Sequence, residues 1–204
     1  IKLFCDLDGT LIDVSSRHYR VYQEVVEQFK GQPLPKKQYW DLKRRKTKWS
    51  ELLPMSMLVA NTEAEFLKLF ITKIEDPQYL EEDTLMPGVK ATLAKFAASY
   101  ECYLVSLRRN AENLLHEIER LDIRRFFTEV LVGHSETDGY DMKIELIKQH
   151  LGESKGVIIG DTEADIIAGQ ELGLTTIALS SGIRDEEFLK ALNPDHLIAG
   201  IAEV

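Results

Sequence analysis

The sequence has few of the features that indicate secretion, membrane insertion or nucleic-acid binding. Only two cysteines occur among 204 residues. Both of them, Cys5 and Cys102, lie in apolar runs, so we expect reduced core residues and neither a disulfide nor a metal pair. We find no signal peptide and no apolar stretch long enough to span a bilayer. The net charge of −9 argues against nucleic acid or an anionic membrane as the main partner, and we expect a cytoplasmic protein.

Short apolar runs alternate with segments of helical periodicity through most of the chain. Asn110 and Thr162 are expected to cap two of these helices, and another helix is expected to end before Gly152. Continuously apolar strands are typical of a sheet buried on both sides, so we predict an α/β fold, a Rossmann-like parallel sheet with helices on both faces. The expected strands are Ile1–Cys5, Cys102–Val105, Glu129–Val132, Gly156–Ile159 and Thr175–Leu179.

One long segment interrupts this alternation, because it contains no convincing strand. Its first helix is expected to stop at Gly31, and a second helix surrounds Trp40. A third helix is expected to start from a capping box formed by Thr62 and Glu65. The predicted organisation is an all-helical subdomain, residues 14–85, inserted into a core domain of residues 1–13 and 86–204.

Polar side chains that could perform chemistry gather where the predicted strands end. In open parallel sheets the ligand site lies beyond the carboxyl ends of the strands. Two carboxylates one residue apart, as in Asp6 and Asp8, repel each other and are expected where a metal ion or a reaction uses them. The alternative for this pair is an Asp-Gly turn that closes a hairpin. The residues expected at this edge of the sheet are Asp6, Asp8, Ser106, Lys143, Asp161 and Asp165.

These residues occur in the order and strand context of a known superfamily. The chain resembles the haloacid dehalogenase superfamily in all four of its motifs. The inserted helical subdomain is similar to the cap of the phosphoglycolate phosphatase group, and the C-terminal segment also resembles that group. The matching residues are Asp6-Leu7-Asp8-Gly9-Thr10, Ser106, Lys143, Gly160-Asp161 with Asp165, Thr176-Ile177-Ala178, Gly182 and Asp195-His196-Leu197-Ile198.

The resemblance implies roles for three of the carboxylates. Asp6 would be the nucleophile that attacks phosphorus and becomes an aspartyl-phosphate. Asp8 would protonate the leaving alcohol and then accept a proton from the hydrolytic water. Mg²⁺ would be bound by the Asp6 carboxylate, the backbone carbonyl of Asp8 and the Asp161 carboxylate.

The resemblance also implies that Ser106 and Lys143 hold the phosphoryl oxygens, with Asp165 in a supporting position. Each of these residues has an ordinary alternative. Ser106 could be a helix N-cap, and Asp165 could only cap the first turn of its helix. Lys148 is the rival of Lys143, because members of the group often place a proline directly after the lysine and this chain does not. We prefer Lys143, because Lys148 lies farther along the helix.

Two groups of basic residues have no assigned role. Arg108 and Arg109 follow Ser106, where they could bind a second anionic group of the substrate, form a solvated helix start or meet the cap. The cluster Lys43–Lys48 lies in the helical subdomain, where such a run is usually a solvated helix face, although a member could select an acidic substrate.

We predict an enzyme, a Mg²⁺-dependent phosphatase that hydrolyses a small phosphate monoester and has a small phosphorylated metabolite as its partner. A phosphomutase of the same superfamily is the nearest alternative, because only water access to the aspartyl-phosphate separates the two. A receiver-like phosphorylation module without turnover is a more distant alternative. A dehalogenase would not need the acid and base that Asp8 supplies. Neither the individual substrate nor the oligomeric state follows from the sequence.

Overall fold

The computed structural model describes residues 1–134, 139–152 and 155–204. The chain divides into two compact units, which we call the core unit, Ile1–Asp13 with Thr84–Val204, and the helical unit, Val14–Asp83. The second boundary lies two residues earlier than the division drawn from the sequence, 14–85. Residues 84 and 85 belong to the core unit because they form a short strand there.

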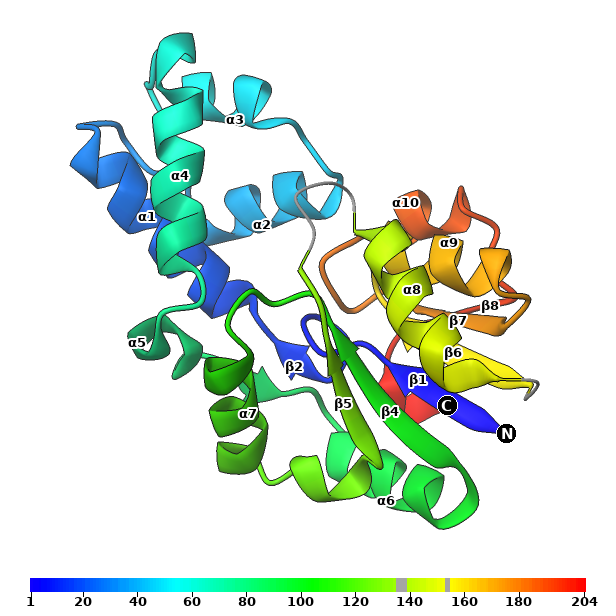
Figure 1. Ribbon diagram of the computed structural model, residues 1–204. Helices are drawn as coiled ribbons and strands as arrows, with labels where there is room; N and C mark the ends of the chain where they lie inside the picture. Colours follow the sequence, from blue (N-terminus) through cyan, green and yellow to red (C-terminus); the bar gives the residue numbers. More distant parts are fainter. Residues whose placement is uncertain (135–138, 153–154) are drawn as a thin grey trace. The chain divides into compact units, whose positions relative to one another are not determined.

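A six-stranded sheet organises the core unit (Figure 1). Its strand order is β5-β4-β1-β6-β7-β8, and every neighbouring pair is parallel. The first strand therefore lies inside the sheet, with Cys5 opposite Leu104 on one side and Ile159 on the other. The strands are β1 (Lys2–Cys5), β4 (Glu101–Ser106), β5 (Glu129–Val132), β6 (Gly156–Gly160), β7 (Thr175–Leu179) and β8 (His196–Ile198).

The helices of the core unit connect these strands. Asn110 caps its helix as predicted, because its side chain accepts a hydrogen bond from the backbone N–H of Asn113 at 3.0 Å. Thr162 and Asp165 form a complete capping box at the start of another helix. The helices are α6 (Val89–Ser99), α7 (Ala111–Arg120), α8 (Tyr140–Leu151), α9 (Glu163–Glu171) and α10 (Glu186–Lys190).

Both faces of the sheet are covered. Every residue from Cys102 to Ser106 is buried, so side chains that point to either face of β4 are excluded from solvent. On one face the rings of Phe4 and Tyr103 stack with centroids 5.2 Å apart. They share a core with Ile147 of α8 and Ala168 of α9. The predicted α/β architecture, a parallel sheet with helices on both faces, is confirmed.

A second, two-stranded sheet was not predicted. Strand β2 (Ile12–Asp13) pairs antiparallel with β3 (Thr84–Leu85), so the statement that residues 14–85 contain no strand is wrong at its last two residues. Two residues are too short to show the alternation by which a strand is recognised from sequence. The pairing joins the two places where the chain leaves and re-enters the core unit.

The helical unit contains three helices near the predicted positions, α1 (Ser15–Gln28), α2 (Lys36–Arg44) and α4 (Glu63–Lys73), and two more, α3 (Trp49–Met55) and α5 (Pro77–Leu80). The expected capping box of Thr62 and Glu65 is wrong, because Thr62 makes no side-chain cap. Its hydroxyl donates instead to the carbonyl of Val59 at 2.7 Å, the local bond that competes with capping. The unit has its own core, in which the rings of Tyr22 and Tyr39 stack with centroids 4.1 Å apart.

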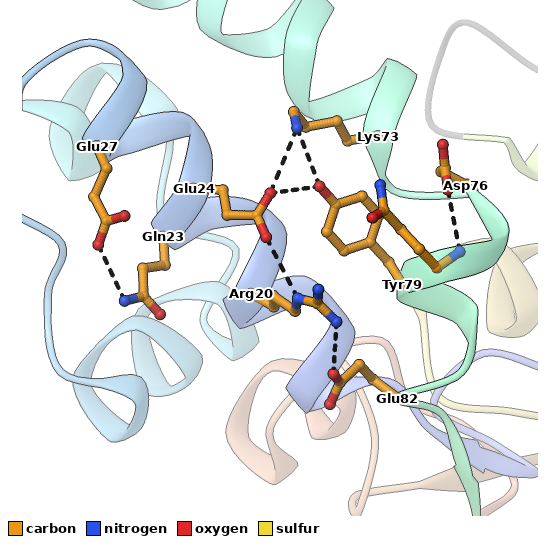
Figure 2. A network of polar contacts seen from close by, with 9 residues as sticks. Arg20, Gln23, Glu24, Glu27, Lys73, Asp76, Tyr79 and Glu82 are labelled. Atoms are coloured by element: carbon orange, nitrogen blue, oxygen red, sulfur yellow. Dashed lines mark hydrogen bonds and ion pairs between the residues drawn. The ribbon is translucent and has the colours of Figure 1, made fainter.

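A polar network joins α1, α4 and the segment around α5 within the helical unit (Figure 2). Glu24 accepts hydrogen bonds from Arg20 at 3.3 Å and from Lys73 at 3.4 Å, and it also accepts one from the Tyr79 hydroxyl. Arg20 donates a further bond to Glu82 at 2.8 Å. The described residues include no helix with the length and apolar character needed to cross a membrane.

Candidate active site

Three of the predicted site residues lie at the carboxyl ends of neighbouring strands. Asp6 directly follows β1, Ser106 ends β4 and Asp161 directly follows β6. Because β1 lies between β4 and β6, these three residues are brought to one edge of the sheet. All three are buried, and Asp161 is completely inaccessible to solvent.

Lys143 lies in the first turn of α8, and its ammonium group bridges two carboxylates. Its Nζ donates to Oδ1 of Asp6 and to Oδ1 of Asp165. Burial by itself would lower the pKa of Lys143, but the negative charges of Asp165 and Asp6 raise it overall, so the lysine is held as a cation. Lys148, its rival, is exposed farther along the same helix. The geometry therefore brings Lys143 and not Lys148 to Asp6.

Asp165 caps its helix, the alternative considered for it from the sequence, and it also contacts Lys143. Its Oδ2 accepts from the backbone N–H of Thr162 at 3.1 Å and from the Thr162 hydroxyl at 2.8 Å, which caps α9. Its Oδ1 accepts from Lys143. One carboxylate thus fixes the start of a helix and the position of the lysine together.

Asp161 is held by a tight cradle that the sequence had not indicated. The hydroxyl of Thr10 donates to its Oδ1 at 2.7 Å, and the backbone N–H of Ile183 donates to its Oδ2 at 2.5 Å. Two glycines allow this approach. A Cβ atom would lie 2.2 Å from Asp161 Oδ2 at Gly9 and 2.1 Å from it at Gly182. Gly9 also has a φ of +85°, a conformation that side chains disfavour.

The buried carboxylates carry more negative charge than Lys143 balances. Asp6, Asp161 and Asp165 each place an oxygen within 4.8 Å of the others. Burial, with added repulsion from Asp165, raises the pKa of Asp6 well above its usual value and that of Asp161 to about 7. A divalent cation with oxygen ligands would offset this charge, so the residues present fit Mg²⁺. All three carboxylates already accept hydrogen bonds within the protein, so the choice of Asp6 and Asp161 as the carboxylate ligands stays a prediction from the sequence.

Asp8 lies apart from this cluster and has a different partner. Arg108 donates through Nε to Oδ2 of Asp8 at 2.8 Å and through Nη2 to Oδ1 at 2.7 Å. Its Nη1 donates to Glu117 of α7, which is as deeply buried as the arginine. Arg108 is thus buried in the core unit, unlike the solvated helix start considered from the sequence. Arg109 is exposed.

Thr10 and Glu117 contribute to the site, although no role was predicted for either of them from the sequence. Thr10 was part of the first motif, but nothing in its local pattern indicates which carboxylate its hydroxyl contacts. Glu117 carried a readable signal, because it stands one position before Ile118 and three after Leu114, on the apolar stripe of α7. A glutamate on a buried stripe requires a cationic partner.

Comparisons with known proteins identify the family of this chain. The family model for haloacid dehalogenase-like hydrolases matches residues 3–179. A phosphoglycolate phosphatase from Synechococcus elongatus is 24% identical over 196 residues, which are 95% of this chain and 90% of that protein. The pyrophosphatase PpaX from Oceanobacillus iheyensis is 21% identical over 206 residues, 98% of this chain and 92% of that protein.

The fold also resembles solved structures. A haloacid dehalogenase-like family protein from Streptococcus pneumoniae aligns with a TM-score of 0.79 at 20% identity, over 99% of this chain and 95% of that one. The family model matches more than half of the chain and spans the motif positions at Asp6, Ser106, Lys143 and Asp161. The protein is therefore an enzyme of the hydrolase class, as predicted, and it belongs to the haloacid dehalogenase-like hydrolase family.

Proposed function

We propose that the protein is a Mg²⁺-dependent phosphatase that hydrolyses a small phosphate monoester through an aspartyl-phosphate on Asp6. The observation that carries the proposal is the placement of the buried Asp6 carboxylate against the ammonium of Lys143, with Ser106 and Asp161 on the neighbouring strand ends. A carboxylate beside a fixed cation can approach an anionic phosphate, because the cation offsets the repulsion between the two.

In the first half of the reaction an Asp6 oxygen forms a bond to phosphorus while the bond from phosphorus to the leaving oxygen breaks. Asp8 donates its proton to that leaving oxygen, which departs as an alcohol. Ser106 and Lys143 bind phosphoryl oxygens through their hydroxyl and ammonium groups. Lys143 is already charged and buried before substrate arrives, so it requires little reorganisation.

In the second half a water molecule attacks phosphorus, and the bond between phosphorus and Asp6 breaks. Asp8, now ionised, accepts a proton from that water, and inorganic phosphate leaves. The two halves use the same proton position in opposite directions, which is why a single acid and base at Asp8 is sufficient. Substitution of Asp6 is therefore expected to prevent formation of the aspartyl-phosphate, whereas substitution of Asp8 is expected to slow the two proton transfers.

Mg²⁺ would be held by the Asp6 and Asp161 carboxylates with the Asp8 backbone carbonyl, where it would neutralise phosphate charge that Lys143 leaves uncompensated. The Thr10 hydroxyl and the Ile183 N–H orient Asp161 for that task.

The helical unit is proposed as the cap that selects the leaving group, while the core unit carries the chemistry. The names of the relatives define which esters to test first. One is called a phosphoglycolate phosphatase and the other a pyrophosphatase. Phosphoglycolate, sugar phosphates and nucleotides therefore belong in one panel, with pyrophosphate as a non-ester comparison.

The test is phosphate release from this panel, with Mg²⁺ and with chelator, by the wild type, Asp6→Asn and Asp122→Asn. Asp122 is a matched control, because it is an exposed aspartate of the core unit that pairs with Lys90 at the surface. We expect Mg²⁺-dependent release by the wild type and the control, and a loss of at least about a thousandfold in Asp6→Asn. Near wild-type release by folded Asp6→Asn would reject Asp6 as the nucleophile.

A phosphomutase would give a different pattern in the same experiment. It would form a hydroxylamine-sensitive phosphoenzyme but release little phosphate to water, and it would return the phosphoryl group to a bound sugar. A receiver-like module would form the phosphoenzyme but would neither release phosphate to water repeatedly nor transfer the phosphoryl group to a sugar. Steady phosphate release with repeated turnovers would exclude both alternatives.

A further inference from the structure

Arg108 makes a three-point contact that no motif of the sequence predicts. Its Nε and Nη2 donate to the two oxygens of Asp8 at 2.8 and 2.7 Å, and its Nη1 donates to Glu117 Oε2. The exposed fraction of the side chain is 4% for Arg108 and 2% for Glu117, against 22% for Asp8. The two inner members are therefore buried, and the carboxylate at the accessible end is the proposed acid and base.

This arrangement fixes the plane of the Asp8 carboxylate. An arginine fork that binds both carboxylate oxygens holds them in the plane of the guanidinium. The guanidinium is in turn fixed by Glu117, and the backbone N–H of Arg108 lies 3.4 Å from the Ser106 hydroxyl oxygen to which it donates. Asp8 can thus be oriented from the fixed end of β4, although it lies on a different segment of the chain.

A lysine cannot reproduce these contacts. Its ammonium is a point charge, whereas the three bonds of Arg108 leave a planar group in set directions toward two separate carboxylates. Glu117 also needs a cation, because a buried carboxylate without one is strongly disfavoured. Arg120 Nη2 lies 3.7 Å from its Oε1 but is more exposed. The geometry explains why an arginine stands at this position.

We propose that Arg108, fixed by Glu117, is a positioning residue that orients the Asp8 carboxylate for proton transfer to the leaving oxygen and from the hydrolytic water. The inference rests on the proposed function, because it requires Asp8 to be the acid and base. In this role Arg108 acts through Asp8 and not by binding the substrate directly, which was one of the roles considered for this arginine from the sequence.

The role makes a specific kinetic prediction, because not every leaving group needs a proton. An alkoxide must be protonated as it leaves, whereas a nitrophenolate is stable without a proton. Loss of Asp8 orientation should therefore slow phosphorylation of Asp6 by an alkyl phosphate and leave phosphorylation by p-nitrophenyl phosphate nearly unchanged. Hydrolysis of the aspartyl-phosphate should slow with both substrates, because it requires the base in each case.

The experiment compares wild type, Arg108→Lys and Arg109→Lys in rapid-quench and steady-state assays with both esters. Arg109 is the matched control, an exposed arginine one position later. For Arg108→Lys and p-nitrophenyl phosphate we expect a burst of about one nitrophenolate per enzyme at the wild-type rate, followed by turnover reduced about ten- to a hundredfold. With the alkyl ester the burst itself should slow by a similar factor. Arg109→Lys should match the wild type.

A second variant protects the test against misfolding, because Arg108→Lys alters the partner of a buried glutamate. Arg108→Met combined with Glu117→Gln removes both buried charges together, and it should show the same leaving-group dependence in a folded protein. Circular dichroism and thermal unfolding establish the fold of each variant. Rescue of wild-type kinetics by the lysine would overturn the proposal, because a point charge would then be sufficient.

Substitution in the Asp8→Asn background separates positioning from substrate binding. If Arg108 acts through Asp8, Arg108→Lys should reduce turnover less than about threefold further in that background. Losses that multiply, together with a raised KM, would show direct substrate binding and overturn the proposal. Equal slowing of the burst with both esters would indicate a general structural defect and would also overturn it.

The outcome stays distinct from failure of the proposed function. If Asp6→Asn or Asp8→Asn keeps wild-type activity, the aspartyl-phosphate mechanism itself is wrong. If those two variants lose activity and Arg108→Lys does not, the mechanism stands and only the positioning role is rejected.

Discussion

Replacement of Lys143 by methionine should destabilise the core unit and abolish turnover together. The ammonium bridges Asp6 and Asp165, and the lysine is 2% exposed. Methionine has a similar length and an apolar chain, so it fills the space without replacing the charge. The two carboxylates would then face each other in a buried site with no cation from α8 between them.

The expected size of the effect follows from the contacts that remain. Removal of one partner of a buried ion pair typically costs about 3–5 kcal/mol of unfolding free energy. Asp165 keeps its two donors from Thr162, so we expect the lower part of this range, about 3–4 kcal/mol in the presence of chelator. For a chain of this size such a loss lowers the unfolding midpoint by about 6–16 °C.

The assay must follow the unfolding of the core unit, which contains Lys143. Both tryptophans, Trp40 and Trp49, lie in the helical unit, so their fluorescence reports the wrong transition. Calorimetry and hydrogen exchange of the β1 and β6 amides would follow the core unit. Lys148→Met is the matched control, because that lysine is exposed on the same helix, and its stability and turnover should stay at wild-type values.

A double variant tests the cause of the destabilisation. Addition of Asp165→Asn to Lys143→Met removes one of the uncompensated charges while an amide oxygen remains to cap α9. Stability should partly return and turnover should not. Equal stability of the Lys143 and Lys148 variants, or a larger loss of turnover at Lys148, would refute the assignment of the lysine.

Two further predictions concern sterics and the helical unit. Gly182→Ala should reduce turnover at least about tenfold, because its Cβ would lie 2.1 Å from Asp161 Oδ2. Gly200→Ala is the control and should have near wild-type turnover, because the nearest atom to its Cβ would be 3.7 Å away. Equal turnover by the two variants would show that the close approach of Gly182 to Asp161 is not needed for activity. Asp83→Asn should lower the unfolding free energy of the helical unit by about 3–5 kcal/mol, because Asp83 and Arg17 form a buried ion pair with atoms 3.1 Å apart. Denaturant unfolding followed by tryptophan fluorescence measures this change, and an unchanged unfolding curve would contradict the prediction.

The main sheet could be predicted because its signals are local. Runs such as Glu129–Val132 and Thr175–Leu179 form strands with the predicted bounds, and Asn110 caps its helix as expected. The two-residue strand Thr84–Leu85 forms because it pairs with Ile12–Asp13, and its own residues show no pattern that would predict a strand. The predicted box at Thr62 was wrong for a related reason, because its hydroxyl had a competing acceptor three residues earlier.

The geometry of the candidate site followed from topology more than from any single motif. Once the strands are parallel, the ends of β1, β4 and β6 must share an edge, and this brings Asp6, Ser106 and Asp161 together. The sequence could not say which oxygen each donor reaches. Asp165 illustrates the point, since a purely capping role was weighed against a supporting role in the site, although the two oxygens of the carboxylate cap α9 and contact Lys143 together.

The Arg108 contact shows that part of a buried ion pair can be predicted from the sequence. Glu117 lies on the apolar stripe of α7, and a buried glutamate implies a cation nearby, so the sequence contains half of the pair. The partner could not be identified, because Arg108, Arg109 and Arg120 all stand within reach along the chain. The choice depends on how α7 packs after β4, which directs one guanidinium inward to Asp8 and leaves Arg109 exposed. A charged residue on a buried stripe is therefore a sequence-readable mark of a fixed polar contact, while its function depends on what the other end of that contact touches.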